Sequence, residues 1–123
     1  MKFLFLVCAS ADADDPAPID ADRTTTTTGA PAEADIEDWV ERHDRAGRRL
    51  FGDRLESQTA VQTVRVRNGD LLVTDGPYLE SKEYIAGIDV IECDSIETAR
   101  QIAAEHPMAH HAGIEIRPFW NGS

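Results

Sequence analysis

The hydrophobic positions of this chain recur with two different periods, which separate the expected strands from the expected helices. Residues 2–8 form an almost continuous apolar run, KFLFLVC, as a central strand covered on both faces would. Residues 84–93 form a second long apolar segment, and 48–55 resemble a shorter strand. In 113–120 isoleucines alternate with charged residues, which is the period of a half-buried strand. The pattern therefore predicts four strands.

The segment from Asp35 to Gly47 has the period of an amphipathic helix. Its apolar face is expected to consist of four residues at i, i+3, i+4 and i+7, namely Ile36, Trp39, Val40 and His43. Asp35 is the expected N-cap, because a short acidic side chain accepts from the free N–H groups of the first turn. Gly47 is expected to end the helix.

A second helix is predicted from Asp94 to the residue before Pro107. Asp94 is expected to cap it, and Glu97, three residues on, completes a capping box. Pro107 ends the helix because proline has no N–H to donate. The expected inner face consists of Ile96, Ala99, Ile102, Ala103 and His106.

Residues 58–74 are predicted to contain a β-hairpin. In 63–67, TVRVR, valines alternate with arginines, which indicates a half-buried strand. The Asn-Gly pair at 68–69 supplies the two positive-φ residues of a type I′ turn. The chain returns through 71–74, and the Asp-Gly-Pro sequence at 75–77 ends the pairing.

The order of these elements is β-α-β, hairpin, β-α-β. Two right-handed split βαβ units give an antiparallel sheet with both helices on one face, which is a ferredoxin-like α+β fold, βαββαβ with an extra β-hairpin. Because the central strands are apolar on both sides, the second face needs a cover. Two sheets packed face to face in a homodimer would provide it.

All 123 residues are expected to form one domain with a low-complexity insertion at 10–34. The insertion combines Asp-Ala alternation, prolines and a run of five threonines. A long segment without a hydrophobic period indicates disorder or a loosely attached insertion, and a lid over a site is the alternative.

The charge of the chain excludes several classes of partner. A net charge of −11 argues against nucleic acid and against an anionic membrane surface. Lys2 and the apolar residues after it could pass for a signal peptide, but a buried first strand is the favoured interpretation. Cys8 and Cys93 are expected at opposite edges of the sheet, too far apart for a disulfide, and a cytoplasmic location is predicted.

Several pieces of the chain, in order, resemble the YCII-related proteins of the DGPF type. The pieces are MKFLFLV, WVERHDRAGRRLFGDRL, TVRVRNGDLLVTDGPYLESKEYIAGIDVIE and AAEHPMAHHAGIEIRPFW, with Tyr78 in place of the Phe of DGPF. The resemblance implies a ferredoxin-like fold paired in dimers of the α/β-barrel type. It also implies two alternative functions: a lyase-like enzyme, as in a dehydrochlorinase of the family, or a regulatory module associated with an extracytoplasmic-function sigma factor.

The resemblance also implies a catalytic pair, a helix His with an Asp that precedes a Pro. His43 stands roughly where the family has its helix His, whereas His106-Pro107 stands where the family has Asp-Pro. We therefore expect His43 to be the acid/base and Asp75 to orient it or to polarise the substrate. The alternatives are a core histidine for His43 and a turn-stabilising aspartate for Asp75.

The cleft near the DGPY loop is expected to bind a small molecule. Asp89 is an acid inside an apolar strand, so it must face a cleft or pair with a base such as Arg49 or Arg117. The full set expected to bind the ligand is Tyr78, Glu80, Lys82, Glu83, Asp89 and His106. No cofactor is expected, and no metal, because Pro107 separates His106 from His110 and His111 and His106 is expected to interact with helix carbonyls instead.

Overall fold

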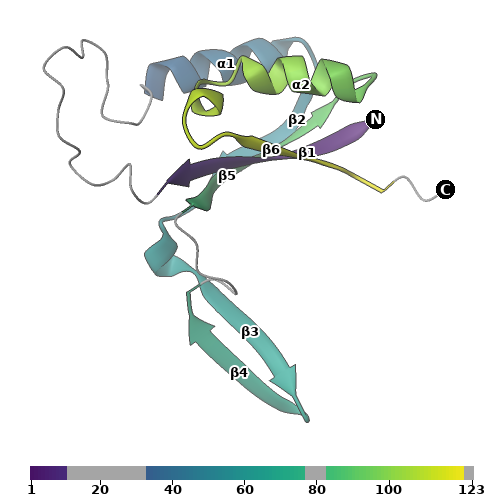
Figure 1. Ribbon diagram of the computed structural model, residues 1–123. Helices are drawn as coiled ribbons and strands as arrows, with labels where there is room; N and C mark the ends of the chain where they lie inside the picture. Colours follow the sequence, from purple (N-terminus) through teal and green to yellow (C-terminus); the bar gives the residue numbers. More distant parts are fainter. Residues whose placement is uncertain (11–32, 77–82, 121–123) are drawn as a thin grey trace, which may run out of the picture.

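The computed structural model describes residues 1–10, 33–76 and 83–120. Within these residues the protein is a mixed α+β structure in which two helices cover one face of a four-stranded antiparallel sheet, while a separate β-hairpin extends away (Figure 1). The sheet contains β1 (Lys2–Ser10), β2 (Arg49–Arg54), β5 (Glu83–Glu92) and β6 (Ile114–Pro118). The remaining elements are α1 (Glu33–Arg45), η2 (Gln58–Ala60), β3 (Gln62–Arg67), β4 (Asp70–Asp75), α2 (Ile96–Ala104) and η3 (Pro107–His110).

The strand order in the sheet is β2-β5-β1-β6, and each neighbouring pair is antiparallel. The apolar run at the N-terminus is a central strand, as predicted, because β1 pairs with both β5 and β6. This order, with both helices on one face, is compatible with the predicted ferredoxin-like α+β arrangement.

The core lies between the sheet and the two helices. Phe3 and Phe5 of β1 and Ile91 of β5 point toward the helices, and all three are fully buried. Trp39 of α1 is also fully buried, and its indole Nε1 donates to the carbonyl of Ile102 in α2 at 3.0 Å. This bond ties the two helices together, because a buried indole N–H without a partner would be costly. The predicted inner faces of both helices are confirmed, except that α2 ends at Ala104, earlier than predicted, so that His106 lies beyond it.

The helix ends differ in part from the prediction. The first helix begins at Glu33, so Asp35 lies within its first turn and is not the N-cap. The second helix is capped by Ser95, whose hydroxyl accepts from the N–H of Thr98, and the expected cap Asp94 was therefore one residue too early. Gly47 follows the end of α1 with a φ of 75°, as expected for a glycine that ends a helix.

The outer face of the sheet, on the side away from the helices, is apolar at its centre. We use the term outer face for Leu4 and Leu6 of β1, Ile88 and Val90 of β5, and Phe51 of β2. The β1 and β5 residues are half-buried, and Phe51 is 57% exposed. The second apolar face that the sequence predicted is therefore present.

The hairpin forms a two-stranded sheet of its own (Figure 1). Asn68 and Gly69 have φ values of 52° and 82°, which confirms the predicted turn. The prediction that these valines are half-buried is wrong for the single chain, because Val64 and Val66 are 59% and 60% exposed. Nothing in the described part of the chain packs on that face closely enough to cover it.

The cysteines are far apart, as predicted. In the β1–β5 register Lys2 lies opposite Glu92 and Cys8 lies opposite Ile85, so Cys8 and Cys93 are at opposite ends of this strand pair, and both are free. In the ranges described, no helix is both long and apolar enough to cross a membrane. Residues 11–32, most of the predicted insertion, lie outside the described residues; Ser10 belongs to β1 and Glu33 to α1.

Candidate functional site

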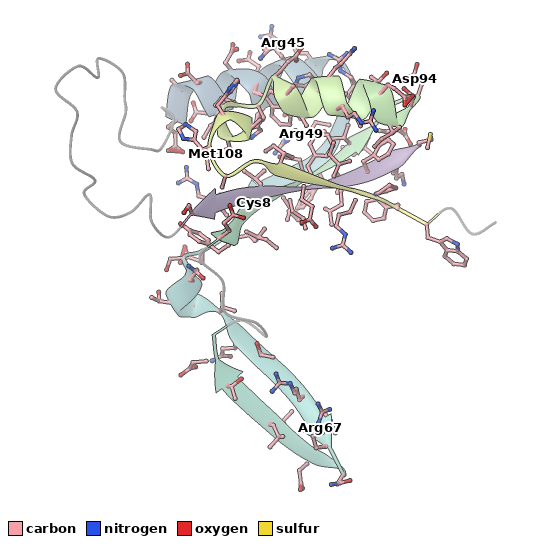
Figure 2. The ribbon with its side chains drawn as sticks, in the orientation of Figure 1. Cys8, Arg45, Arg49, Arg67, Asp94 and Met108 are labelled. Atoms are coloured by element: carbon pink, nitrogen blue, oxygen red, sulfur yellow. The ribbon has the colours of Figure 1, made fainter. Side chains whose placement is uncertain are left out.

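A cleft of about 740 Å³ opens between α1, β2, β5 and η3. Its apolar wall includes Ile36, Val40 and Met108, and its polar wall includes Arg49, Tyr84, Asp89 and His106. Figure 2 shows Arg49 between the helical layer and the sheet, and Met108 of η3 lines the same cleft. An apolar cleft with a few convergent polar groups is the usual form of a small-molecule site.

Asp89 lies at the floor of the cleft and pairs with Arg49. Asp89 is 5% exposed, and its Oδ1 accepts from Nε of Arg49 on the neighbouring strand at 2.7 Å. Arg49 Nη1 also donates to Asp44 Oδ1 at 3.0 Å. Burial raises the pKa of Asp89 above its ordinary value even though Arg49 opposes that shift. The pairing with Arg49 confirms the sequence-based expectation for this buried acid.

Gly52 makes room for this ion pair. The β2–β5 register places Gly52 opposite Asp89. A Cβ atom at position 52 would collide with the carboxylate of Asp89 and the guanidinium of Arg49, and it would lie 2.8 Å from the carbonyl oxygen of Ile88. Only glycine therefore fits here, because the charged groups occupy the volume that a side chain would need.

His106 presents a hydrogen-bond donor to the cleft. Its Nδ1 accepts from the N–H of Met108 at 3.0 Å, so the neutral ring carries its proton on Nε2. Nε2 has no hydrogen-bond partner in the described residues, whereas every fully buried side-chain nitrogen or oxygen there has one. Nε2 is therefore accessible, and the open space beside His106 is the cleft that this residue lines.

The ring of His106 is held neutral by its surroundings. It is 3% exposed and packs edge-on against Trp39, with 4.6 Å between the ring centroids. Burial, with a smaller contribution from the positive charge of Arg49, lowers the pKa of His106 to about 4. The prediction that His106 contacts the carbonyls at the end of α2 is wrong, because its side chain caps the start of η3 instead.

His43 is buried beside the cleft and does not line it. Its Nδ1 accepts from Arg48 Nε at 3.2 Å, and its Nε2 lies 3.0 Å from Glu105 Oε1. Because Nδ1 accepts, Nε2 carries the proton and donates to Glu105. Burial and the charge of Arg48 lower the pKa of His43. The carboxylate partner of His43 is therefore Glu105 and not the predicted Asp75, because both ring nitrogens of His43 already have hydrogen-bond partners.

The other predicted site residues lie away from the cleft or outside the described residues. Asp75 is exposed at the end of β4, opposite Gln62, and Glu83 is exposed at the start of β5. The remaining three, Tyr78, Glu80 and Lys82, lie outside the described residues. Of the predicted set, the cleft thus brings together Asp89 and His106.

Sequence reasoning missed Glu105, although a carboxylate directly before the His-Pro pair was a usable signal. It also missed Arg48, whose contact with His43 depends on the tight turn after α1. Among the residues that the structure describes, no three His, Cys, Asp or Glu side chains are grouped as metal ligands.

The arrangement combines two donors with one base. His106 Nε2–H faces the cleft, and Arg49 Nη2 lies over Gly52, which also lines it. These donors can hold an oxygen atom on which negative charge develops. Asp89 can accept a proton more readily than an ordinary carboxylate, because its pKa is raised.

Comparison with known proteins identifies a matching family and one similar protein. The profile of the YCII-related domain matches residues 3–121. The chain is similar to "Uncharacterized protein R00369" of Rhizobium meliloti (strain 1021), with 36% identity over 68 residues. The match spans 54% of this chain and 55% of the relative, so the chain covers about half the length of that protein.

Proposed function

Because the chain belongs to the YCII-related domain family, we propose that it binds a small organic carbonyl compound in the cleft and moves a proton on it. The observation that carries this proposal is the meeting of Asp89, Arg49 and His106 in one cleft. Asp89 removes a proton from the carbon next to the carbonyl group. His106 Nε2–H and Arg49 then stabilise the enolate oxygen, because hydrogen-bond donors offset the negative charge that develops on it. In a lyase-like reaction the enolate would then re-form the carbonyl and a C=C bond while the bond between the next carbon and its leaving group breaks, and the protonated Asp89 would give its proton to the departing anion.

The sequence suggested an acid-base role for His43 and Asp75. In this proposal Asp89 and His106 take that role instead. His43 is 1% exposed, and both of its ring nitrogens are bonded, so it supports the site through packing. Its neighbour Trp39 lies 4.8 Å from it and 4.6 Å from His106, between ring centroids. His43 therefore positions the histidine that faces the cleft.

The test is a titration of small carbonyl compounds followed by backbone amide shifts. Compounds that bind should shift the amides of Gly52, Gly87 and Met108, which line the cleft. His106→Asn keeps a side-chain acceptor for the N–H of Met108 but removes the Nε2–H donor, so affinity should fall roughly tenfold. His110→Asn, at an exposed histidine, is the matched control and should bind as the natural protein does.

The proton-transfer step has its own readout. For a compound that binds, deuterium from solvent should enter the carbon next to the carbonyl, and Asp89→Asn should abolish that exchange. Binding without exchange would reduce the proposal to a binding protein. If no carbonyl compound shifts the cleft amides, the proposed site fails, and the regulatory module associated with a sigma factor becomes the hypothesis to test.

We also propose that the protein acts as a cytoplasmic homodimer. The outer face supports this, because a sheet that is apolar on both sides is stable in water when a second layer covers it. Two outer faces packed together would give the dimeric α/β-barrel arrangement. Light scattering should then report twice the chain mass, whereas a monomer at all concentrations would refute it.

A further inference from the structure

The hairpin carries an apolar face that one chain does not cover. Its register places Val64 opposite Val73 and Val66 opposite Leu71, so the four aliphatic side chains lie on one face. We call these four residues the hairpin face. Each is between 48% and 66% exposed. A two-stranded hairpin is at best marginally stable alone in water, so packing on this face would be needed to hold it.

The position of the hairpin suggests which surface covers it. In Figure 1 the helices lie above the four-stranded sheet, and the hairpin extends on the opposite side, below it. The outer face and the hairpin therefore border the same region of space. A molecule that packs against the outer face lies beside the hairpin and can contact both.

The charges of the two surfaces fit a second copy of this chain. The chain as a whole has a net charge of −11, which opposes self-association through most of its surface. The hairpin strands are an exception, because Arg65 and Arg67 balance Asp70 and Asp75. At the margin of the outer face, Glu115 is paired with Arg117 at 3.2 Å. The hairpin strands therefore carry no net charge, although Asp75 lies on the same face as Val73, and two copies repel each other less here than through the acidic remainder of the surface.

The geometry points to the hairpin as an arm that packs its aliphatic face on a second copy of this chain. This inference rests on the proposed homodimer and goes beyond it, because it assigns part of the interface to residues outside the four-stranded sheet. In a twofold dimer each copy contributes one arm and receives one, so every contact occurs twice.

A matched pair of variants tests the arm. Leu71 lies on the hairpin face, whereas its neighbour Leu72 lies opposite Arg65 on the other side of the hairpin. Leu71→Glu and Leu72→Glu add the same charge one residue apart. Leu71→Glu should raise the dimer dissociation constant roughly 100-fold or more, because it places a carboxylate in each of two apolar contacts. Leu72→Glu should leave that constant within a few-fold of the original.

The measurement is the mass by light scattering over a range of protein concentrations, with circular dichroism to confirm the fold of each variant. A second measurement uses a mixture of ¹³C-labelled and unlabelled chains, in which methyl groups of the hairpin face should show intermolecular NOEs. If the natural protein is a dimer but Leu71→Glu dissociates no more than Leu72→Glu, or if those NOEs are absent, the inference is overturned while the homodimer stands.

A monomeric natural protein would overturn both the arm and the homodimer. The cleft proposal is tested separately, because none of the four residues of the hairpin face lines the cleft. Carbonyl compounds should therefore still shift the cleft amides in Leu71→Glu.

Discussion

Acid should destabilise this protein through His106. The ring is neutral and buried in the folded chain, where its pKa is about 4, whereas the ordinary value that applies when the chain is unfolded is 6.5. The unfolded chain therefore binds the proton more readily. The contribution of the neutral His106 ring to stability is fully present above pH 6.5 and is lost as the pH falls toward 4.

The size of the effect follows from the two pKa values. Each pKa unit corresponds to about 1.4 kcal/mol, so lowering the pH from 7 to 5 should cost about 2 kcal/mol in the free energy of unfolding. At pH 4 the cost should reach about 3 kcal/mol. His43 adds a contribution of the same sign, because its pKa is also lowered. Asp89 contributes with the opposite sign, because its pKa is raised.

Urea unfolding at pH 7, 6 and 5 measures this dependence, and the comparison with His106→Asn isolates it. The variant lacks the titrating ring, so it should lose about 2 kcal/mol less than the natural protein between pH 7 and 5. The contributions of His43, Asp89 and the net charge are common to both proteins and cancel in the difference.

Equal losses of unfolding free energy in His106→Asn and in the natural protein between pH 7 and 5 would contradict this prediction. That result would mean that the imidazole is protonated as easily in the folded chain as in the unfolded one, so it would not be buried against Trp39 as the structure has it. The NMR chemical shifts of the His106 ring, followed from pH 7 to 4, would give the same answer independently.

Two substitutions test the packing that supports the cleft. Gly52→Ala should destabilise the fold by about 3 kcal/mol, because its methyl group must displace the buried pair of Asp89 and Arg49; a loss below about 1 kcal/mol in urea unfolding would contradict this. Trp39→Phe should cost about 2 kcal/mol, since it leaves a smaller ring in the core and removes the bond to Ile102; an unchanged melting temperature would count against it.

The local predictions succeeded where neighbouring residues decide the outcome. The Asn68-Gly69 turn and the end of α1 at Gly47 follow from backbone preferences that each short segment carries by itself. The N-cap of α2 moved from Asp94 to Ser95, because both residue types cap well and the packing of Ile96 selects between them.

The residues of the candidate site could be predicted only in part. Asp89 was recognisable because an acid in an apolar strand must be paired or face a cleft, and of the two bases offered, Arg49 and Arg117, the structure pairs it with Arg49. The partner of His43 was not recognisable, because Glu105 is 62 residues away and meets it only when α1 and the end of α2 pack together.

The kinds of elements, their order and most of their inner faces follow from local sequence patterns, because periodicity and capping act within a few residues. Which side chains meet depends on the packing of distant segments: Gly52 leaves space for the ion pair of Asp89, and His106 lines the cleft with its Nδ1 bonded to Met108. The tertiary structure also left the hairpin outside the sheet with its aliphatic face uncovered. These contacts join residues far apart in the chain, and no local pattern encodes the distances between them.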